Sequence, residues 1–115
     1  MNLKCHCGNV EISIKEKPKS LTSCNCSICN RYASLWAYYN KEEVFIKVGE
    51  EGISSYTCGD KSLTFKHCNI CRCITHYKTN DENKTVVNFR MADIKEIDSI
   101  RIRRFDGADT WKYLD

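Results

Sequence analysis

The 115-residue sequence has no long hydrophobic run, and none of its apolar stretches approaches the length of a membrane span. A transmembrane helix needs about 20 predominantly apolar residues, so the sequence predicts no membrane-spanning helix. Residues 1–20 also lack the apolar segment of a secretory signal peptide. We therefore expect a cytoplasmic protein with no membrane partner.

A large excess of one charge is also missing. Eighteen Lys and Arg against fifteen Asp and Glu leave a net charge of +3, whereas a nucleic-acid-binding domain usually carries a concentrated basic block. The densest basic group, Arg101, Arg103 and Arg104, is interleaved with apolar residues, which is typical of a strand with one solvated face. We do not expect a nucleic-acid partner.

Repeats, low-complexity tracts and linkers are absent as well, and there is one proline, Pro18. A hydrophobic fraction of 42% and a charged fraction of 29% are ordinary for a globular protein. We therefore expect residues 1–115 to form a single domain. A domain of this size has a modest core and gains from an additional cross-link.

Cysteine, in contrast, is abundant, with nine residues in the chain. So many cysteines could indicate a secreted disulfide scaffold. The odd count and the missing signal peptide oppose that interpretation, and seven of the nine occur at spacings typical of metal ligands. The sequence therefore favours metal binding, with Cys58 and Cys73 left over.

Three of these cysteines lie within six residues, Cys24-Asn25-Cys26-Ser27-Ile28-Cys29. Thiolates are soft ligands that zinc and iron bind strongly, and the two spacings allow all three sulfurs to reach one ion. Three ligands leave one position of a tetrahedral ion open. Either water or a substrate fills that position, or a fourth protein ligand does, with Cys58, Cys73 and His76 as candidates.

The other four well-spaced cysteines form two pairs, Cys5-x-Cys7 and Cys68-x-x-Cys71. In an extended segment, Cys5 and Cys7 would point to the same face and could bind one ion together. Joined to the second pair, they would make a closed four-thiolate site, whose binding energy becomes folding energy. Iron is an alternative metal, but division of the thiols into four and three favours zinc.

Short strands at close spacing predict a mainly β, mostly antiparallel domain with little helix. Strands are expected at 10–14, 21–23, 32–39, 44–48, 53–58, 62–67, 74–78, 85–90 and 99–105. Gly59-Asp60 and the segment 80–83 have the composition of hairpin turns, and 91–98 is expected to contain a helical turn. The segment 32–39 is rich in aromatic residues and is expected to be buried on both faces.

The chain resembles the glutathione-dependent formaldehyde-activating enzyme (Gfa) family, which includes centromere protein V-type proteins. The motifs that carry the resemblance are Cys5-His6-Cys7-Gly8-Asn9-Val10, the Cys24–Cys29 loop, Cys68-x-x-Cys71, Asn88-Phe89-Arg90, and Phe105-Asp106-Gly107 with Trp111. They follow the family order over nearly the whole chain. Arg72 departs from the pattern, since the family commonly has glycine after the second Cys of that pair.

This resemblance implies a single Gfa-like zinc-binding domain with a β-tent fold, in which two small antiparallel sheets surround the zinc sites. It implies two Zn²⁺ ions, a structural one on Cys5, Cys7, Cys68 and Cys71 and a catalytic one on Cys24, Cys26 and Cys29. The implied activity joins glutathione to formaldehyde to give S-hydroxymethylglutathione, formally a carbon–sulfur lyase reaction. Candidate contacts with glutathione are Asn88, Arg90 and Trp111.

Two other kinds of function remain open at this point. Capture of a thiol by a zinc–thiolate site needs no turnover, so the domain could bind or carry glutathione without catalysis. A zinc-stabilised module for interaction with protein or nucleic acid is the second alternative. The implied partners of the enzyme are a small thiol such as glutathione and a small aldehyde.

Overall fold

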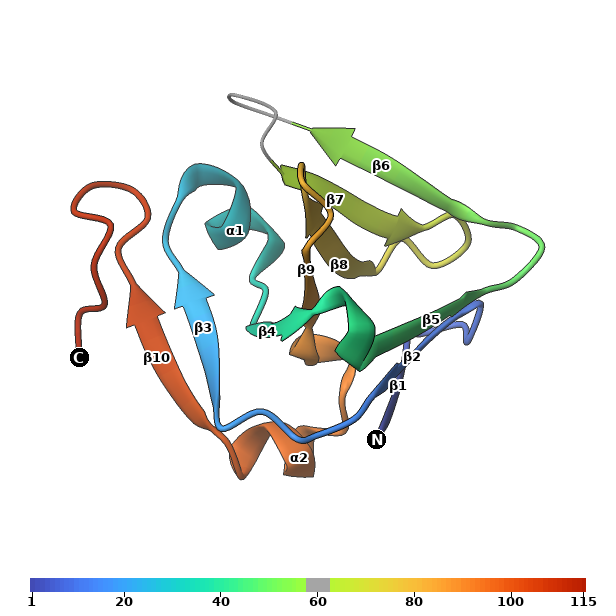
Figure 1. The fold of residues 1–115 in the computed structure, drawn as a ribbon, viewed down its shortest axis with the longest axis horizontal. Coiled ribbons are helices and arrows are strands. Elements are labelled where there is room, and N and C mark those ends of the chain that lie inside the picture. Colours follow the sequence, from blue (N-terminus) through green and yellow to red (C-terminus); the bar gives the residue numbers. More distant parts are fainter. Residues whose placement is uncertain (58–62) are drawn as a thin grey trace.

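In the computed structural model, which describes residues 1–57 and 63–115, the chain is mainly β with little helix, as predicted (Figure 1). The described strands are β1 (Asn2–Lys4), β2 (Val10–Ile14), β3 (Ser20–Cys24), β4 (Trp36–Asn40), β5 (Val44–Val48), β6 (Ile53–Thr57), β7 (Leu63–Cys68), β8 (Ile74–Thr79), β9 (Lys84–Asn88) and β10 (Arg101–Phe105). The helices are α1 (Ser27–Tyr32) and α2 (Ile94–Asp98), with single 3₁₀ turns at Lys41–Glu43 and Phe89–Met91.

These strands form two sheets. The smaller has the order β1-β2-β5 and the larger the order β10-β3-β4-β9-β8-β7-β6. The pairings are mostly antiparallel, as predicted, and the exception among the described strands is the parallel pairing of β10 with β3. A parallel pair needs a long crossover, and here the chain between β3 and β10 supplies most of the larger sheet. The parallel pairing places the end of β10 beside Cys24.

Most of the predicted strands are confirmed, because alternation of apolar and polar residues fixes which face is buried. In β2, Val10, Ile12 and Ile14 are buried while the residues between them are not. The turn between β8 and β9 lies where expected, and α2 is the helical turn predicted within 91–98. The hairpin turn predicted at Gly59-Asp60, and Cys58 with it, lie outside the described residues.

The prediction of a strand over 32–39 is wrong in its first half. The helix α1 ends at Tyr32, and β4 begins only at Trp36. Cys26 caps the helix, because its sulfur accepts a hydrogen bond from the backbone N–H of Cys29. Ala33 then takes a left-handed conformation (φ 53°), which ends the helix and turns the chain. The second half of the predicted strand is confirmed by β4, but its expected burial on both faces is not, since Tyr38 is exposed.

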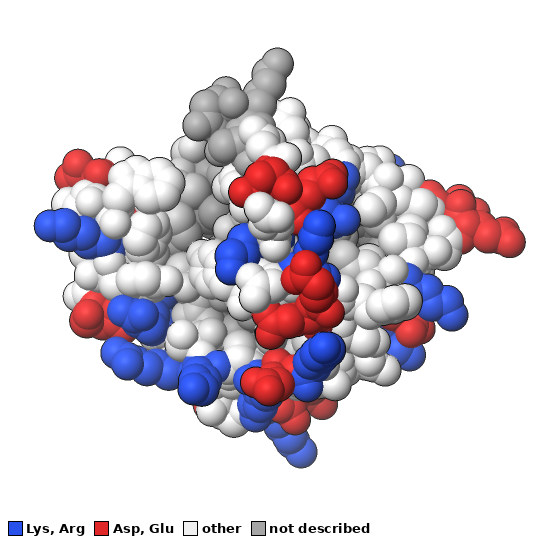
Figure 2. Space-filling model, viewed as in Figure 1, with Lys and Arg blue, Asp and Glu red and all other residues white. Residues whose placement is uncertain are grey.

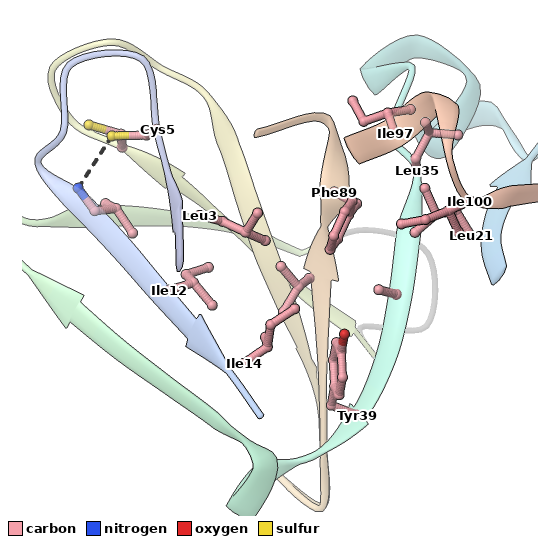
Figure 3. Close-up of a cluster of buried hydrophobic side chains, with 14 residues drawn as sticks. Leu3, Cys5, Ile12, Ile14, Leu21, Leu35, Tyr39, Phe89, Ile97 and Ile100 are labelled. Atoms are coloured by element: carbon pink, nitrogen blue, oxygen red, sulfur yellow. Dashed lines mark hydrogen bonds between the residues drawn. The ribbon is translucent and has the colours of Figure 1, made fainter. Parts of the chain in front are cut away.

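The main core lies between the two sheets (Figure 3). Leu3, Ile12 and Ile14 of the small sheet face Phe89 and the strands of the large sheet, and all four side chains are buried. The other buried members are Cys5, Val10, Leu21, Leu35, Ala37, Tyr39, Cys68, Val87, Ile97 and Ile100. Cys5 and Cys68 therefore belong to the core as well as to a candidate metal site.

A second buried cluster lies under α1. Trp36, Phe65 and Tyr77 form its centre, with ring centroids 4.8 to 6.1 Å apart. Such aromatic pairs add to the stabilisation that burial provides. Cys29 is part of this cluster, so the cysteine loop at the start of α1 is anchored on a rigid aromatic base.

The surface carries charges of both signs. Figure 2 shows Lys and Arg side chains interspersed with Asp and Glu side chains on one face, without a large basic block. None of the helices in the described part of the chain is long and apolar enough to cross a membrane.

Candidate metal centres and active site

The four-cysteine cluster joins two turns that are distant in sequence. Cys5 and Cys7 lie in the turn between β1 and β2, while Cys68 ends β7 and Cys71 lies in the turn that follows. The expectation that Cys5 and Cys7 lie in an extended segment is wrong. The backbone N–H of Gly8 donates to the carbonyl of Cys5, and this turn brings both sulfurs to the same side.

The sulfur positions in this cluster fit a tetrahedral zinc ion. The Cys5 and Cys7 sulfurs are 3.7 Å apart, and those of Cys7 and Cys68 are 3.6 Å apart. Four sulfurs at about 2.3 Å from a tetrahedral zinc lie about 3.8 Å from one another. These separations are too long for a disulfide, whose S–S bond is about 2.05 Å, and the eight described cysteines are free.

Hydrogen-bond donors surround these sulfurs. The backbone N–H groups of Val10 and Ile70 donate to the sulfurs of Cys5 and Cys68, each at 3.3 Å. Burial raises the pKa of Cys71, but hydrogen bonds with the backbone of Cys73 and Cys7 outweigh it and lower the pKa to about 5. Such donors favour the thiolate form that a metal binds.

Backbone strain is present beside this cluster. Arg72 has a φ of 66°, in the left-handed region, where a side chain costs on the order of 1 kcal/mol relative to glycine. Its backbone N–H donates to the carbonyl of Cys68, which closes the turn. The departure from glycine at this position therefore leaves the turn geometry intact.

The three-cysteine cluster is built from one loop. Cys24 ends β3, Cys26 caps α1 and Cys29 lies in its first turn, and the three sulfurs are within 4.8 Å of one another. The sulfur of Cys26 accepts from the N–H of Cys29 at 3.4 Å. The indole Nε1–H of Trp36 donates to the sulfur of Cys29 at 3.3 Å. The spacing and these donors suit a metal ion.

Burial acts differently on the sulfurs of this loop. It raises the pKa of Cys29, the most deeply buried of the three, even though the indole of Trp36 stabilises its thiolate. Burial also raises the pKa of Cys26, but hydrogen bonds with the backbone of Cys29 and Ile28 bring it below its ordinary value. The loop therefore holds one sulfur near solvent and one in the aromatic cluster.

No fourth His, Cys, Asp or Glu among residues 1–57 and 63–115 joins the three sulfurs. Two of the alternative ligands are placed elsewhere. Cys73 lines a separate cavity with His6. His76 is buried, and its ring Nδ1 hydrogen-bonds with the hydroxyl of Thr75 at 2.8 Å. Burial lowers the pKa of His76 to about 3, so this ring is a neutral, satisfied strand residue.

A polar cavity of about 200 Å³ borders the three-cysteine cluster. Cys24, Cys29, Ser34 and Arg90 line it. The Ser34 hydroxyl is buried, with the residue only 3% exposed, and has no hydrogen-bond partner among the described residues. Unsatisfied buried hydroxyls are uncommon and destabilising, and this one belongs to a residue that lines the cavity.

A second cavity of about 150 Å³ borders the same cluster and is mostly apolar. Its walls include the six side chains of Trp36, Tyr38, Leu63, Tyr77, Phe105 and Trp111, in addition to the three cysteines. The two cavities share Cys24 and Cys29 and differ in their other walls. The cluster therefore faces a polar space and an apolar one.

The C-terminal segment completes this site. Gly107 lies so close to Cys24 that a Cβ built on it would be 2.6 Å from the Cys24 sulfur. Asn25 fixes the segment, since its amide donates to Asp106 at 3.0 Å and accepts from the backbone N–H of Ala108 at 3.0 Å. The Phe105-Asp106-Gly107 motif was noted in the sequence, but its contact with the cysteine loop depends on the parallel pairing of β10.

The three predicted glutathione contacts occupy different environments. Asn88 is 5% exposed, and its side chain accepts from the N–H groups of Leu35 and Arg90 and donates to Ile74. Arg90 is exposed, and its Nε donates to the carbonyl of Ala33 at 2.9 Å. Trp111 is 74% exposed, so it is no core anchor.

Comparison with known proteins gives the family. A family model described as glutathione-dependent formaldehyde-activating enzyme matches residues 1–104. The chain belongs to this family. A crystal structure of a Rhodobacter sphaeroides protein has a similar fold, with a TM-score of 0.74 and 22% identity over 89% of this chain and 99% of that one. A search of curated proteins gave no significant match.

Family membership together with the two sheets confirms the predicted Gfa-like β-tent fold. It supports a function of the glutathione-dependent formaldehyde-activating type in general. The two cysteine clusters could each hold a metal ion.

Proposed function

We propose that the protein is a zinc-dependent enzyme of the carbon–sulfur lyase type. It joins glutathione, or a related small thiol, to an aldehyde such as formaldehyde, and forms S-hydroxymethylglutathione with formaldehyde. The observation that carries this proposal is the three-cysteine cluster, whose sulfurs come from one loop and border two cavities without a fourth described protein donor. Family membership supports the same type of reaction.

The two clusters have different roles in this proposal. Cys5, Cys7, Cys68 and Cys71 hold a structural zinc ion that joins the β1–β2 turn to the end of β7. Cys24, Cys26 and Cys29 would hold a second ion and leave its fourth position open. At that position a thiol sulfur would bind, and its pKa would fall. We also propose that residues 1–115 make one zinc-binding domain, located in the cytoplasm.

The polar cavity would bind a carboxylate of glutathione. Arg90 brings a positive charge to the cavity, and its Nε–H bond to Ala33 holds the guanidinium there. The hydroxyl of Ser34, which has no hydrogen-bond partner among the described residues, would donate to the same carboxylate. A charge-assisted hydrogen bond from Arg is among the stronger polar contacts, so this cavity would favour an anionic thiol.

Asn88 would act on the substrate through its neighbours. Its side-chain oxygen accepts from Leu35 at 3.2 Å and from Arg90 at 3.1 Å, and its amide donates to Ile74 at 2.8 Å. These bonds fix the start of the 3₁₀ turn that carries Arg90. We therefore propose a positioning role for Asn88, while Trp111 contacts substrate from the rim of the apolar cavity.

The bond changes are simple. The thiolate sulfur adds to the carbonyl carbon and forms the C–S bond, and the π electrons of the carbonyl move to its oxygen. That oxygen takes a proton, which balances the one released by the thiol. The residues of the site contribute by holding the two reactants together, which converts a bimolecular step into an effectively unimolecular one.

The test must separate catalysis from the spontaneous addition of formaldehyde to thiols. Exchange spectroscopy by NMR measures the rate of adduct formation from glutathione and formaldehyde with and without zinc-loaded protein. We expect the protein to raise this rate, and Cys26→Ala to return it to the uncatalysed value while remaining folded. A protein that binds glutathione without raising the rate would be a non-catalytic thiol-binding module, and the enzyme assignment would be wrong.

A further inference from the structure

The apolar cavity beside the three-cysteine cluster is larger than formaldehyde needs. Formaldehyde has two heavy atoms, whereas the cavity measures about 150 Å³. An apolar cavity of about that volume is large enough to bind benzene. Even after a thiol sulfur enters at the cysteine end, space remains for several carbon atoms.

The walls of this cavity match a hydrocarbon group. Trp36 and Tyr77 form its buried base and contact each other with ring centroids 4.8 Å apart. Phe105 and Trp111 form the other side, with centroids 5.6 Å apart. Water in such a cavity finds few polar partners, and its replacement by an apolar group is favourable.

The charged groups of glutathione fit the polar cavity rather than the apolar one. Arg90 and Ser34 line the polar cavity, not the apolar one, and the Ser34 hydroxyl has no partner in the described part of the chain. Glutathione carries carboxylates and an ammonium group, whose transfer into an aromatic cavity without partners is costly. The apolar cavity is therefore free for the second reactant.

Resting on the proposed thiol–aldehyde function, we infer that the apolar cavity binds the hydrocarbon substituent of the carbonyl substrate. The preferred substrate is then an aldehyde with an apolar group of roughly four to six carbons, as the comparison with benzene indicates, rather than formaldehyde. The resulting adduct has its hydroxyl-bearing carbon beside the cysteines, its alkyl or aryl group among the aromatic walls and its carboxylate at Arg90.

Trp111 is the residue that this inference explains best. Its indole is 74% exposed at the cavity rim, and its backbone has a φ of 58°, a conformation that non-glycine residues rarely adopt. A hydrogen bond from its N–H to the carbonyl of Asp106, at 2.8 Å, holds this conformation. An apolar ligand in the cavity would cover part of the exposed indole.

Titration with S-alkylglutathiones tests the inference, because these stable compounds place an alkyl group on the sulfur as the adduct does. We expect the affinity of the zinc-loaded protein to rise about three- to fourfold per methylene from S-methyl to S-butyl. Trp111→Ala should remove much of this gain per methylene, because it takes away one wall of the cavity. Phe45→Ala, which removes another exposed aromatic that does not line this cavity, should keep the gain.

Two results would overturn the inference. In one, glutathione binds but the added methylenes give no gain in affinity. In the other, Trp111→Ala and Phe45→Ala keep the same full gain, so the alkyl group binds elsewhere. If the protein binds neither glutathione nor any S-alkylglutathione, the proposed function itself is wrong. That result differs from the two above, in which glutathione still binds.

Discussion

The two cysteine clusters use the same ligand type but draw on different amounts of the chain. The four-cysteine cluster joins turns more than sixty residues apart, at 5–7 and 68–71, and two of its members are core residues. The three-cysteine cluster comes from six consecutive residues on an aromatic base. Loss of the first disconnects distant parts of the fold, whereas loss of the second disturbs one loop.

The surroundings of the two clusters also differ in a way that favours a structural role for the four cysteines and ligand binding at the three. Around the four cysteines, the Asn9 side chain donates to the carbonyl of Gly52 at 3.1 Å and to the Cys68 sulfur at 3.6 Å. Around the three cysteines there are two cavities and a buried hydroxyl that none of residues 1–57 and 63–115 hydrogen-bonds. Complete satisfaction of polar groups is typical of structural sites, and incomplete satisfaction of sites that await a ligand.

The largest effect is expected from Cys68→Ala. Cys68 is fully buried and supplies one of four thiolates, and binding of a structural zinc provides about 10–16 kcal/mol of folding free energy in small domains. This is comparable with a total stability of about 5–15 kcal/mol, so the variant should be unfolded by circular dichroism. Cys73→Ala, in the same turn region but outside both clusters, is the control and should fold. A folded Cys68→Ala protein would contradict the structural role.

Arg90→Gln tests the open site without touching a cysteine. Loss of the guanidinium should weaken glutathione binding about tenfold, since hydrogen bonds to charged groups contribute about 1.5–3 kcal/mol and this side chain is partly solvated. Zinc content should not change. Arg31→Gln removes another exposed arginine, which contacts Ser27 on α1 and lies outside the polar cavity. Equal affinities of the two variants in calorimetric titration would exclude Arg90 as the carboxylate contact.

Ser34→Ala should change stability and binding in opposite directions. The variant removes a buried hydroxyl that has no described partner, and relief of that desolvation should stabilise the free protein by about 1 kcal/mol. Binding of glutathione should weaken, because the carboxylate loses a donor. Denaturant unfolding and titration of the same samples measure both effects. A loss of both stability and affinity would mean that the hydroxyl has a structural role.

Two glycines report separately on the two clusters. Gly8 has a φ of 84° and open space around it, so Gly8→Ala should cost about 1 kcal/mol of stability without affecting glutathione binding. Gly107→Ala places a methyl group against the Cys24 sulfur and should reduce zinc retention and glutathione binding at the open site. Competition with a chelator measures zinc retention, and calorimetric titration measures glutathione binding. If both variants changed these two properties equally, the proposed difference between the clusters would be wrong.

Cluster membership was predictable because the signal is local. Cys-x-Cys and Cys-x-x-Cys spacings restrict which sulfurs can meet, and the grouping of four and three matches the structure. The strands were predictable for the same reason, since alternation identifies a buried face. The helix α1 was missed because cysteine is not among the usual N-cap residues, while the aromatic residues at 32–39 favour a strand.

The cavities were not predictable from the sequence. Trp36, Tyr77 and Trp111 come from three distant segments, and the parallel pairing of β10 with β3 decides where the last of them lies. The buried hydroxyl of Ser34 carries no sequence signal at all. Arg90 was a candidate through the family motif, but its anchor on Ala33 depends on the left-handed turn after α1.

The four-cysteine site is expected to hold the fold together, and the three-cysteine site to be open to a thiol. Zinc content and glutathione titration of the wild type and of Cys26→Ala, both purified without chelator, test this division. We expect two zinc ions and saturable glutathione binding in the wild type, and one zinc, no binding and a folded chain in Cys26→Ala. Two zinc ions without glutathione binding in the wild type, or unfolding of Cys26→Ala, would contradict it.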